Sequence, residues 1–178
     1  TRNKKHFQAL LNRINLFFPI VERVLREEGI PEDFKYRVIQ ESSMMADAVH
    51  VACTVGFWQF KDYTAAEVGL KIDAQVDERM HIVASTRGAA KYLKSNNRYL
   101  DNWLHTLLAY NRGRGYVEKE LGRRKYRGAK QMRIDSKTHW YIIHFLAHKL
   151  VFESKAGKER HPTLHLHEYK EVHGKTLQ

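Results

Sequence analysis

The sequence predicts an all-α domain. Apolar residues recur at the 3.6-residue spacing of amphipathic helices along most of the chain, and glycines, prolines and capping residues stand between these segments. The chain has 178 residues, 43% of them hydrophobic, with only three prolines and ten glycines. A chain of this length can bury about 70% of the surface that its unfolded form exposes, which suits one globular domain.

The first two helices are predicted to meet at a glycine and a proline. The apolar face of the first helix comprises Leu10, Leu11, Ile14, Phe17, Phe18, Val21 and Leu25. Pro19 is expected to bend this helix, Gly29 to end it and Pro31 to start the next one. The second helix should carry Glu41 on or just past its last turn. The helical period is lost over residues 42–55, which predicts a loop.

Two further helices are predicted before residue 100. A short helix over residues 63–68 is closed by Gly69, because glycine readily takes the left-handed conformation that follows a helix. Ser85 is expected to cap the next helix, which runs through Leu93, because a serine hydroxyl accepts a hydrogen bond from a first-turn N–H group.

The C-terminal third predicts two more helices. Asp101 is the expected cap of a helix that runs through Leu108. The helical pattern is then expected to break at Asn111, Gly113 and Gly115. Asp135 or Ser136 should start the last helix, whose apolar residues are Ile142, Ile143, Leu146 and Leu150.

The chain is strongly basic. Its formal net charge is +11 and its pI is about 9.8, which predicts attraction to polyanions. Basic residues are densest over residues 123–133. This run is interpreted as a solvated face, with contact to an anionic cell wall or membrane surface as the alternative, and no nucleic-acid-binding motif accompanies it.

Cysteines, histidines and apolar runs give weaker signals. The single Cys53 cannot form an internal disulfide and is interpreted as a small loop or core residue. No apolar run approaches the ~20 residues of a membrane-spanning helix, and residues 1–6 do not form a signal peptide. Histidines cluster near the C terminus, without the spacing of a metal site: His161, His165, His167 and His173.

Three blocks carry the functional signal. They are Glu41-Ser42 at a helix end, the block of residues 56–60 (Gly-Phe-Trp-Gln-Phe) and the block 109–111 (Ala-Tyr-Asn). A glutamate at a helix end can donate a proton to a glycosidic oxygen if neighbouring aromatic side chains exclude water. Trp58 and Tyr110 are the candidates for that wall.

In order and spacing these blocks resemble the soluble lytic transglycosylase family (glycoside hydrolase family 23), in particular its membrane-bound lytic murein transglycosylase D branch. The likeness covers residues 30–153, with further matching blocks at 30–34, 64–70, 76–79, 85–93 and 134–141. It implies a lysozyme-like domain with an open substrate groove over 30–153, preceded by an amphipathic helix (1–29) that packs on the core. A basic, His-rich extension would follow (154–178).

The resemblance implies a reaction without cofactor or metal. Glu41 would protonate the glycosidic oxygen between N-acetylmuramic acid and N-acetylglucosamine, and would then act as base while the C6 hydroxyl attacks C1 to form a 1,6-anhydro ring. The protein would be a monomer that acts on peptidoglycan strands in the bacterial envelope, in the periplasm or at the outer membrane. Its export signal would then lie outside this sequence. A lysozyme-type hydrolase and a catalytically weak wall-binding module are the alternatives.

The resemblance also implies roles for residues around the glutamate. Tyr110 would orient the catalytic carboxyl, unless it is plain core. Gln59 would bind a sugar substituent or, alternatively, brace the loop; Asn111 would contact sugar or take a left-handed turn conformation. Ser42 would touch substrate or hold the loop. The other predicted substrate-binding residues are Trp58 and His50, the latter at a position where relatives have serine. The loop departs from the family pattern at Ser43, Met45, Ala46, His50 and Cys53.

Overall fold

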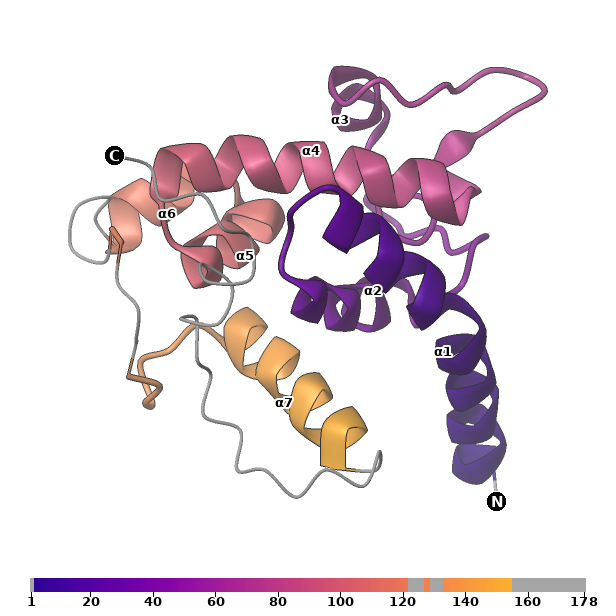
Figure 1. The fold of residues 1–178 in the computed structure, drawn as a ribbon, viewed down its shortest axis with the longest axis horizontal. Helices are drawn as coiled ribbons and strands as arrows, with labels where there is room; N and C mark the ends of the chain where they lie inside the picture. The colour runs from indigo at the N-terminus through magenta and orange to yellow at the C-terminus, as the bar shows by residue number, and fades with distance from the viewer. Residues whose placement is uncertain (1, 122–126, 129–132, 155–178) are drawn as a thin grey trace. The chain divides into compact units, whose positions relative to one another are not determined.

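The computed structural model describes residues 2–121, 127–128 and 133–154, and among these residues it contains helices, turns and isolated bridges but no strand (Figure 1). The expected all-α class is therefore confirmed. The C-terminal extension with its four histidines lies outside the described residues, as does most of the basic run 123–133.

The first helix, α1, spans Arg2–Glu27 and is not interrupted at Pro19. Figure 1 shows its axis changing direction along its length. Its C-terminal half buries one face, made by Ile14, Phe18, Val21, Val24 and Leu25. The helix ends as expected at Gly29, whose φ is 65°, and Ile30 N–H donates to the Leu25 carbonyl at 2.8 Å.

A 3₁₀ turn and a short helix follow. The turn η1 covers Glu32–Phe34 and leads directly into α2, Lys35–Ser42, and both elements contact α1. The Phe18 and Tyr36 rings meet edge to face at 5.6 Å. Ser43 ends α2 in the left-handed conformation (φ 51°), and Arg13 of α1 donates from Nε to its carbonyl at 2.9 Å.

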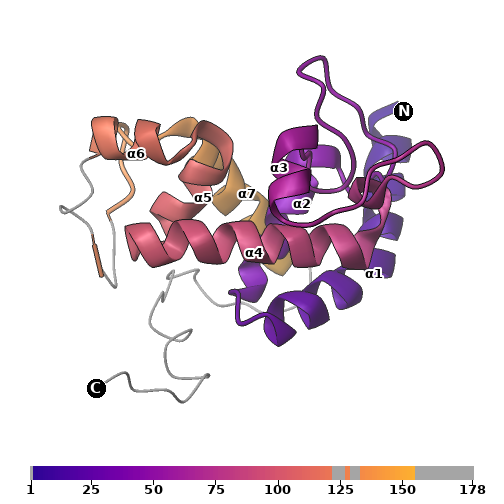
Figure 2. The same cartoon turned by 90° about the horizontal axis from the view of Figure 1, so that it is seen from above.

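Residues 43–61 form the predicted loop, and the short predicted helix follows it as α3, Asp62–Glu67. Gly69 follows α3 with φ 81°. This region lies beside α4 (Figure 2), because Lys91 Nζ donates to the Val68 carbonyl at 3.0 Å and Gly88 leaves room for Val68.

The helix predicted to begin at Ser85 begins earlier. α4 spans Ile82–Leu100, after the 3₁₀ turn η2, Glu78–Met80. The expected cap is therefore wrong: Ser85 lies inside the helix, and its hydroxyl donates to the His81 carbonyl at 2.8 Å. The His81 ring takes the capping role, because its Nδ1 accepts from the Ala84 N–H group at 3.2 Å.

The next helix, α5, spans Trp103–Arg112, and its cap is Asn102 rather than the predicted Asp101. Asn102 Oδ1 accepts from the His105 N–H group at 3.0 Å. Asp101 instead ends α4 with a positive φ of 47°, and its N–H group donates to the Asn97 carbonyl.

The break predicted over residues 111–115 occurs at one residue. Gly113, with φ 81°, separates α5 from α6, Arg114–Leu121. Asn111 is helical, so the left-handed alternative for it is wrong and its contact with sugar stays a prediction, and Gly115 lies inside α6.

The last helix, α7, spans Trp140–Ser154, several residues later than predicted. Asp135 makes a local turn instead, in which its N–H group donates to the Thr138 hydroxyl and its carboxylate accepts from the Lys137 N–H group. His139 precedes the helix, and its Nδ1 accepts from the Tyr141 N–H group at 3.2 Å.

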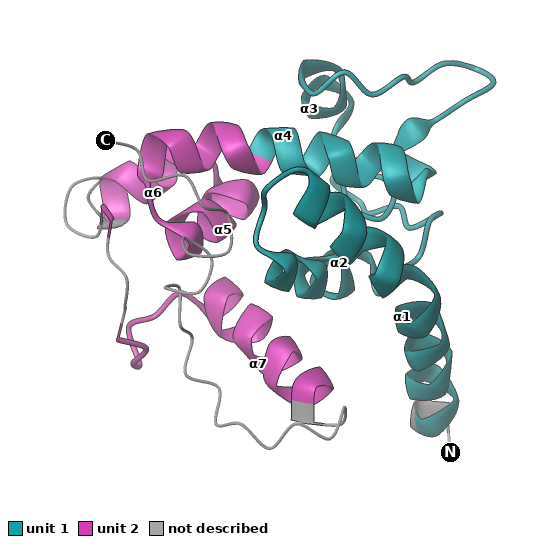
Figure 3. Ribbon diagram, in the orientation of Figure 1, with its two compact units in different colours: residues 1–92 teal, residues 93–178 magenta. Residues whose placement is uncertain are grey.

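The chain divides into two compact units, residues 1–92 and 93–178 (Figure 3). The core of unit 1 includes Val21, Val38, Trp58, Phe60 and Ala65. The core of unit 2 includes Leu93, Leu104, Leu108, Val117 and Phe145. Within unit 2, α5 contacts both α6 and α7. Each unit is described by itself below.

Candidate active site

Glu41 lies on the last turn of α2, as the sequence predicted. Its side chain is 15% exposed, and its Oε1 accepts a hydrogen bond of 2.8 Å from Nη1 of Arg37, one helical turn earlier. The Arg37 side chain is only 1% exposed. A charge-assisted hydrogen bond from a buried guanidinium restricts the carboxylate to few orientations.

Ser42 fastens the end of α2 to the block of residues 56–60. Its buried hydroxyl lies 2.9 Å from the Phe57 carbonyl and 3.1 Å from the Val38 carbonyl. A hydroxyl has one proton, so it donates to one of these oxygens at a time. The geometry matches the loop-holding alternative that the sequence left open for Ser42.

The 56–60 block depends on a glycine. Gly56 has φ 81°, and a Cβ added there would lie 2.0 Å from the Arg79 carbonyl oxygen. Within the block, Trp58 is fully buried and its indole N–H donates to the Thr86 hydroxyl at 3.0 Å. Trp58 has no exposed surface in this structure, and its predicted contact with substrate stays a prediction.

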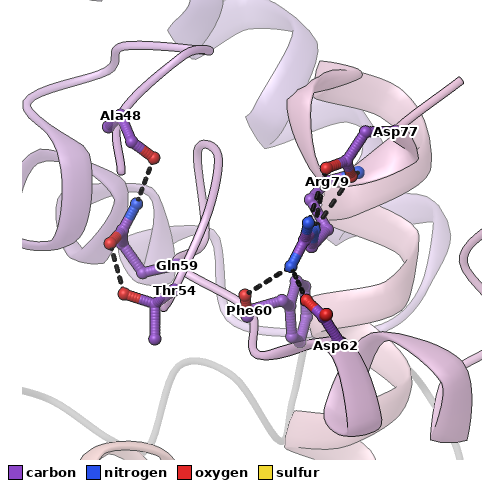
Figure 4. A network of polar contacts seen from close by, with 7 residues as sticks. All are labelled: Ala48, Thr54, Gln59, Phe60, Asp62, Asp77 and Arg79. Carbon is purple, nitrogen blue, oxygen red and sulfur yellow. Dashed lines mark hydrogen bonds and ion pairs between the residues drawn. The ribbon is translucent and has the colours of Figure 1, made fainter. Parts of the chain in front are cut away.

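Gln59 braces the loop through its amide (Figure 4). Its Nε2 donates to the carbonyls of Ala48 and Gly56, each at 2.9 Å, and its Oε1 accepts from the Thr54 hydroxyl at 2.6 Å. Gln59 itself has a positive φ of 51°, an unusual conformation for a residue with a side chain. These contacts correspond to the bracing alternative for Gln59, and its predicted contact with sugar stays a prediction.

Arg79 joins the start of α3 to the 77–79 turn (Figure 4). Its guanidinium donates to both Asp77 carboxylate oxygens, at 2.6–3.1 Å, and to the carboxylate of Asp62, and its Nη1 lies 3.5 Å from the Phe60 carbonyl. Hydrogen bonds from Arg79 hold the pKa of Asp77 below its ordinary value of 3.8. The hydrogen-bonded Asp77 in turn raises the pKa of Arg79. The ion pair between Arg79 and Asp77 therefore fixes the C-terminal end of the 56–60 block.

The middle of the 43–55 loop is exposed. His50 points its Nδ1 at the Ala52 N–H group at 3.3 Å, and Val51 is 94% exposed. Cys53 is exposed with φ 58°, so it is a loop residue rather than a core residue. The loop is thus fixed at its ends and by the Gln59 amide.

Tyr110 and Asn111 belong to unit 2, on the last turn of α5. Tyr110 is half-buried and Asn111 is exposed. Glu41 belongs to unit 1, so the predicted support of Glu41 by Tyr110 stays a prediction. Sequence reasoning missed Arg37, although its i,i+4 spacing to Glu41 is the spacing at which charged residues pair on a helix.

The described residues hold neither a group of metal-ligating side chains nor a helix that could span a membrane. No three His, Cys, Asp or Glu side chains in the ranges 2–121, 127–128 and 133–154 are placed to hold a metal ion. In the same ranges, no helix has the length and apolar character that crossing a membrane requires.

These features define an all-α protein in which a helix ends at a glutamate held by a buried arginine. Residues 20–133 match the family described as the transglycosylase SLT domain. The match covers more than half of the chain, so this chain belongs to that family.

Two curated relatives, both named membrane-bound lytic murein transglycosylase D, come from Escherichia coli strains K12 and O6:H1. Each is 30% identical over 128 residues, which are 71% of this chain and 28% of the relative. The chain therefore spans less than a third of their length. An inactive mutant of lytic transglycosylase Slt from Pseudomonas aeruginosa superposes with a TM-score of 0.56 at 19% identity, over 77% of this chain and 24% of that one. The predicted lysozyme-like fold class agrees with this likeness.

Proposed function

We propose that the chain is the catalytic domain of a peptidoglycan lytic transglycosylase, with Glu41 as both general acid and general base. The observation that carries the proposal is the place of Glu41 within the family match: it ends α2, its carboxylate is held by Arg37, and Ser42 fastens it to the 56–60 block. The curated relatives are named as murein transglycosylases, which supports the same polymer as substrate.

The proposed reaction needs one carboxylate in two states. A protonated Glu41 donates to the glycosidic oxygen, and the resulting carboxylate then accepts the proton of the C6 hydroxyl as that oxygen closes the anhydro ring. The hydrogen bond from Arg37 to Oε1 suits both states, because the carbonyl oxygen of a protonated carboxyl group also accepts a hydrogen bond.

A water-activating partner would make the protein a hydrolase instead. Inverting glycosidases place a second carboxylate roughly 6.5–9.5 Å from the acid, and retaining ones about 5–5.5 Å. Asp47, the first acid after Glu41 in the sequence, is exposed in the loop. We therefore favour transfer to the C6 hydroxyl over transfer to water.

A catalytically weak wall-binding module is the second candidate. It is favoured by one observation, namely that the amide of Gln59 and the indole of Trp58 are engaged within the protein. Such a module would bind sacculi without releasing soluble fragments. Digestion of purified sacculi separates the two candidates.

The test is digestion of purified sacculi, followed by mass spectrometry of the products. Wild type should release muropeptides with 1,6-anhydro ends, and Glu41→Gln should lose roughly 10²–10⁴ of the rate, because an amide cannot deliver a proton. Glu67→Gln, a change to an exposed acid on α3, is the control and should keep the wild-type rate. Reducing muramic ends would indicate a hydrolase, and binding without products would indicate the weak module.

The envelope is the proposed location. The relatives are named membrane-bound, and a net charge of +11 favours retention on the anionic wall or membrane surface. Fractionation of cells that produce the tagged full-length protein would check this location.

A further inference from the structure

A second cluster of functional side chains lies in unit 2. It comprises one cation and four rings, here called the Arg112 cluster: Arg112, Tyr116, His139, Trp140 and His144. Its members come from the end of α5, from α6, from the residue before α7 and from the first two turns of α7. None of them was predicted as a site residue.

The members touch in an unbroken series. The Arg112 Cζ lies 4.6 Å from the centroid of the Tyr116 ring, and Tyr116 meets His139 edge to face at 5.9 Å. His139 and Trp140 lie 5.6 Å apart with an interplanar angle of 32°, and Trp140 meets His144 at 5.3 Å. The series therefore fixes the relative positions of a cation and an indole.

Both ends of the series face solvent. Arg112 and His144 are exposed, and Trp140 is 56% exposed although it is among the largest apolar side chains in the protein. Large exposed aromatic side chains next to arginine are typical of binding surfaces. The exposure of Trp140 beside a cation leaves an aromatic face open to a ligand.

The chemistry of the cluster indicates what the ligand carries. A guanidinium that stacks on Tyr116 through its face keeps its N–H groups in the plane, where they can meet a carboxylate in bidentate fashion. Trp140 offers an apolar face for an aliphatic group. Burial, with the nearby charge of Arg112 as a smaller cause, lowers the pKa of His139 below 6.5, so its ring is neutral at neutral pH. Its Nδ1 accepts from the Tyr141 N–H group, which leaves Nε2 as a hydrogen-bond donor.

We propose that the Arg112 cluster binds an acidic peptide, namely the carboxylate-bearing stem peptide of a peptidoglycan strand. A ligand with a carboxylate near a small apolar side chain satisfies Arg112 and Trp140 together, whereas a neutral sugar leaves the cation unused. The naming of the peptide rests on the proposed function, which supplies the polymer. The cluster would then select strands that still carry their stems.

The chain offers a matched control. Arg114 is also exposed and also stacks on a tyrosine, with its Cζ 5.3 Å from the centroid of Tyr99, but that pair is separate from the Arg112 cluster. Arg112→Gln and Arg114→Gln remove the same charge from the same unit. Only Arg112→Gln should change binding of the stem peptide.

Binding is measured in the Glu41→Gln background, so that no strand is cut during the assay. Each variant is sedimented with intact sacculi and with sacculi whose stems an amidase has removed. Arg112→Gln should weaken binding to stem-bearing sacculi by about 3–10-fold, the size expected for an exposed charged contact, and should change binding to stem-free sacculi much less. Arg114→Gln should match its parent on both.

A second measurement locates the contact. Titration of a soluble acidic stem peptide, followed by NMR, should shift the indole N–H signal of Trp140 and the guanidinium signal of Arg112, and should leave the buried indole of Trp58 in place. Equal losses in the two arginine variants would overturn the proposal in favour of non-specific charge. An equal loss on stem-free sacculi would make the cluster a sugar subsite.

The two proposals can fail separately. If the protein binds stems through Arg112 but releases no anhydro products, the proposed function is wrong and the peptide site stands. Release of anhydro products together with unchanged stem binding by Arg112→Gln would remove the peptide site alone.

Discussion

At the scale of single residues, the orientation of Glu41 is set by its own helix. Arg37 and Glu41 occupy one face of α2 a turn apart, and Arg37 is almost completely buried. Holding a carboxylate in one rotamer before substrate arrives spares the reaction an ordering step. Arg37 is thus a positioning residue in the proposed mechanism.

Arg37→Met should lower kcat by about 10–100-fold with little change in KM, because the contact acts on Glu41 and a hydrogen bond to a charged group is worth about 1.5–3 kcal/mol. Methionine fills most of the buried volume and Glu41 keeps some contact with solvent, so the fold should persist at reduced stability. Initial rates on sacculi, with thermal unfolding as control, check this. Arg37→Lys should recover part of kcat, and a Met variant faster than wild type would show that Arg37 restrains the acid.

Gln59 offers a second prediction at this scale. Gln59→Ala removes three hydrogen bonds and should lower the free energy of unfolding by about 1.5–4.5 kcal/mol, since each neutral bond contributes roughly 0.5–1.5 kcal/mol. Thr54→Val removes one of the three and should show a smaller loss. Urea unfolding measures both. If Gln59→Ala keeps full stability and loses affinity for a chitooligosaccharide, its amide serves the sugar rather than the loop.

At the scale of elements, the block of residues 56–60 is held by backbone proximity as well as by side chains. Gly56 approaches the Arg79 carbonyl so closely that no side chain fits, and Arg79 in turn binds Asp62 and Asp77. The turn η2 and the start of α3 are therefore fastened to the segment that follows α2.

Gly56→Ala should destabilise unit 1 by about 3 kcal/mol or more, because a methyl group would overlap the Arg79 backbone in addition to the cost of its left-handed conformation. Gly113→Ala is the matched control: it has the same φ of 81° and nothing within 4 Å of the added carbon. It should cost about 1–3 kcal/mol, because φ 81° with ψ 156° is a conformation that residues with a side chain rarely adopt. Equal losses in chemical unfolding would contradict the overlap.

The helices themselves could be predicted from the sequence better than their starts. The apolar period placed α1, α2, α3 and α5 because packing follows that period. The starts of α4 and α7 were missed because histidine rings, at His81 and His139, accept the first-turn hydrogen bonds usually taken by serine or aspartate.

The candidate site could be predicted less fully. Glu41 follows from its motif and helix end, whereas the burial of Trp58 depends on Thr86, a residue distant in sequence. The internal bonds of Gln59 depend on backbone carbonyls that no side-chain pattern reveals.

At the scale of the whole molecule, the two units carry different acid-sensitive groups. In unit 2, burial lowers the pKa values of His105, His139 and His148 below 6.5, with nearby Arg112 and His144 as smaller causes for the latter two. In unit 1, a hydrogen bond from Arg79 lowers the pKa of Asp77 below 3.8. Protonation therefore opposes the folded state of each unit in a different pH range.

The direction in which stability changes with pH follows from which state, folded or unfolded, binds more protons. Below pH 6.5 the unfolded histidines bind protons that the folded ones refuse, so stability falls as the pH falls. The contribution of Asp77 is present above about pH 3.8 and is lost as the pH drops through its lower folded value. Between pH 7 and 5, amide protection factors, which are corrected for the pH dependence of intrinsic exchange, should therefore fall first in α5 and α7, and His105→Leu should weaken this trend. A parallel fall in both units would show that they unfold together.

The hydrogen bond from Ser42 to the 56–60 block has a consequence for sequence variation in the loop between them. The segment between Ser42 and Gly56 is anchored by a hydroxyl at one end, a glycine at the other and the Gln59 amide across it, and its central residues face solvent. The exposed residues of this segment can therefore change without loss of packing, as the departures at Ser43, Met45 and Cys53 illustrate, whereas the buried Met44 and Val55 cannot. Residues 49–53 could be replaced by a stretch of equal length from another family member without redesign of the helices around them.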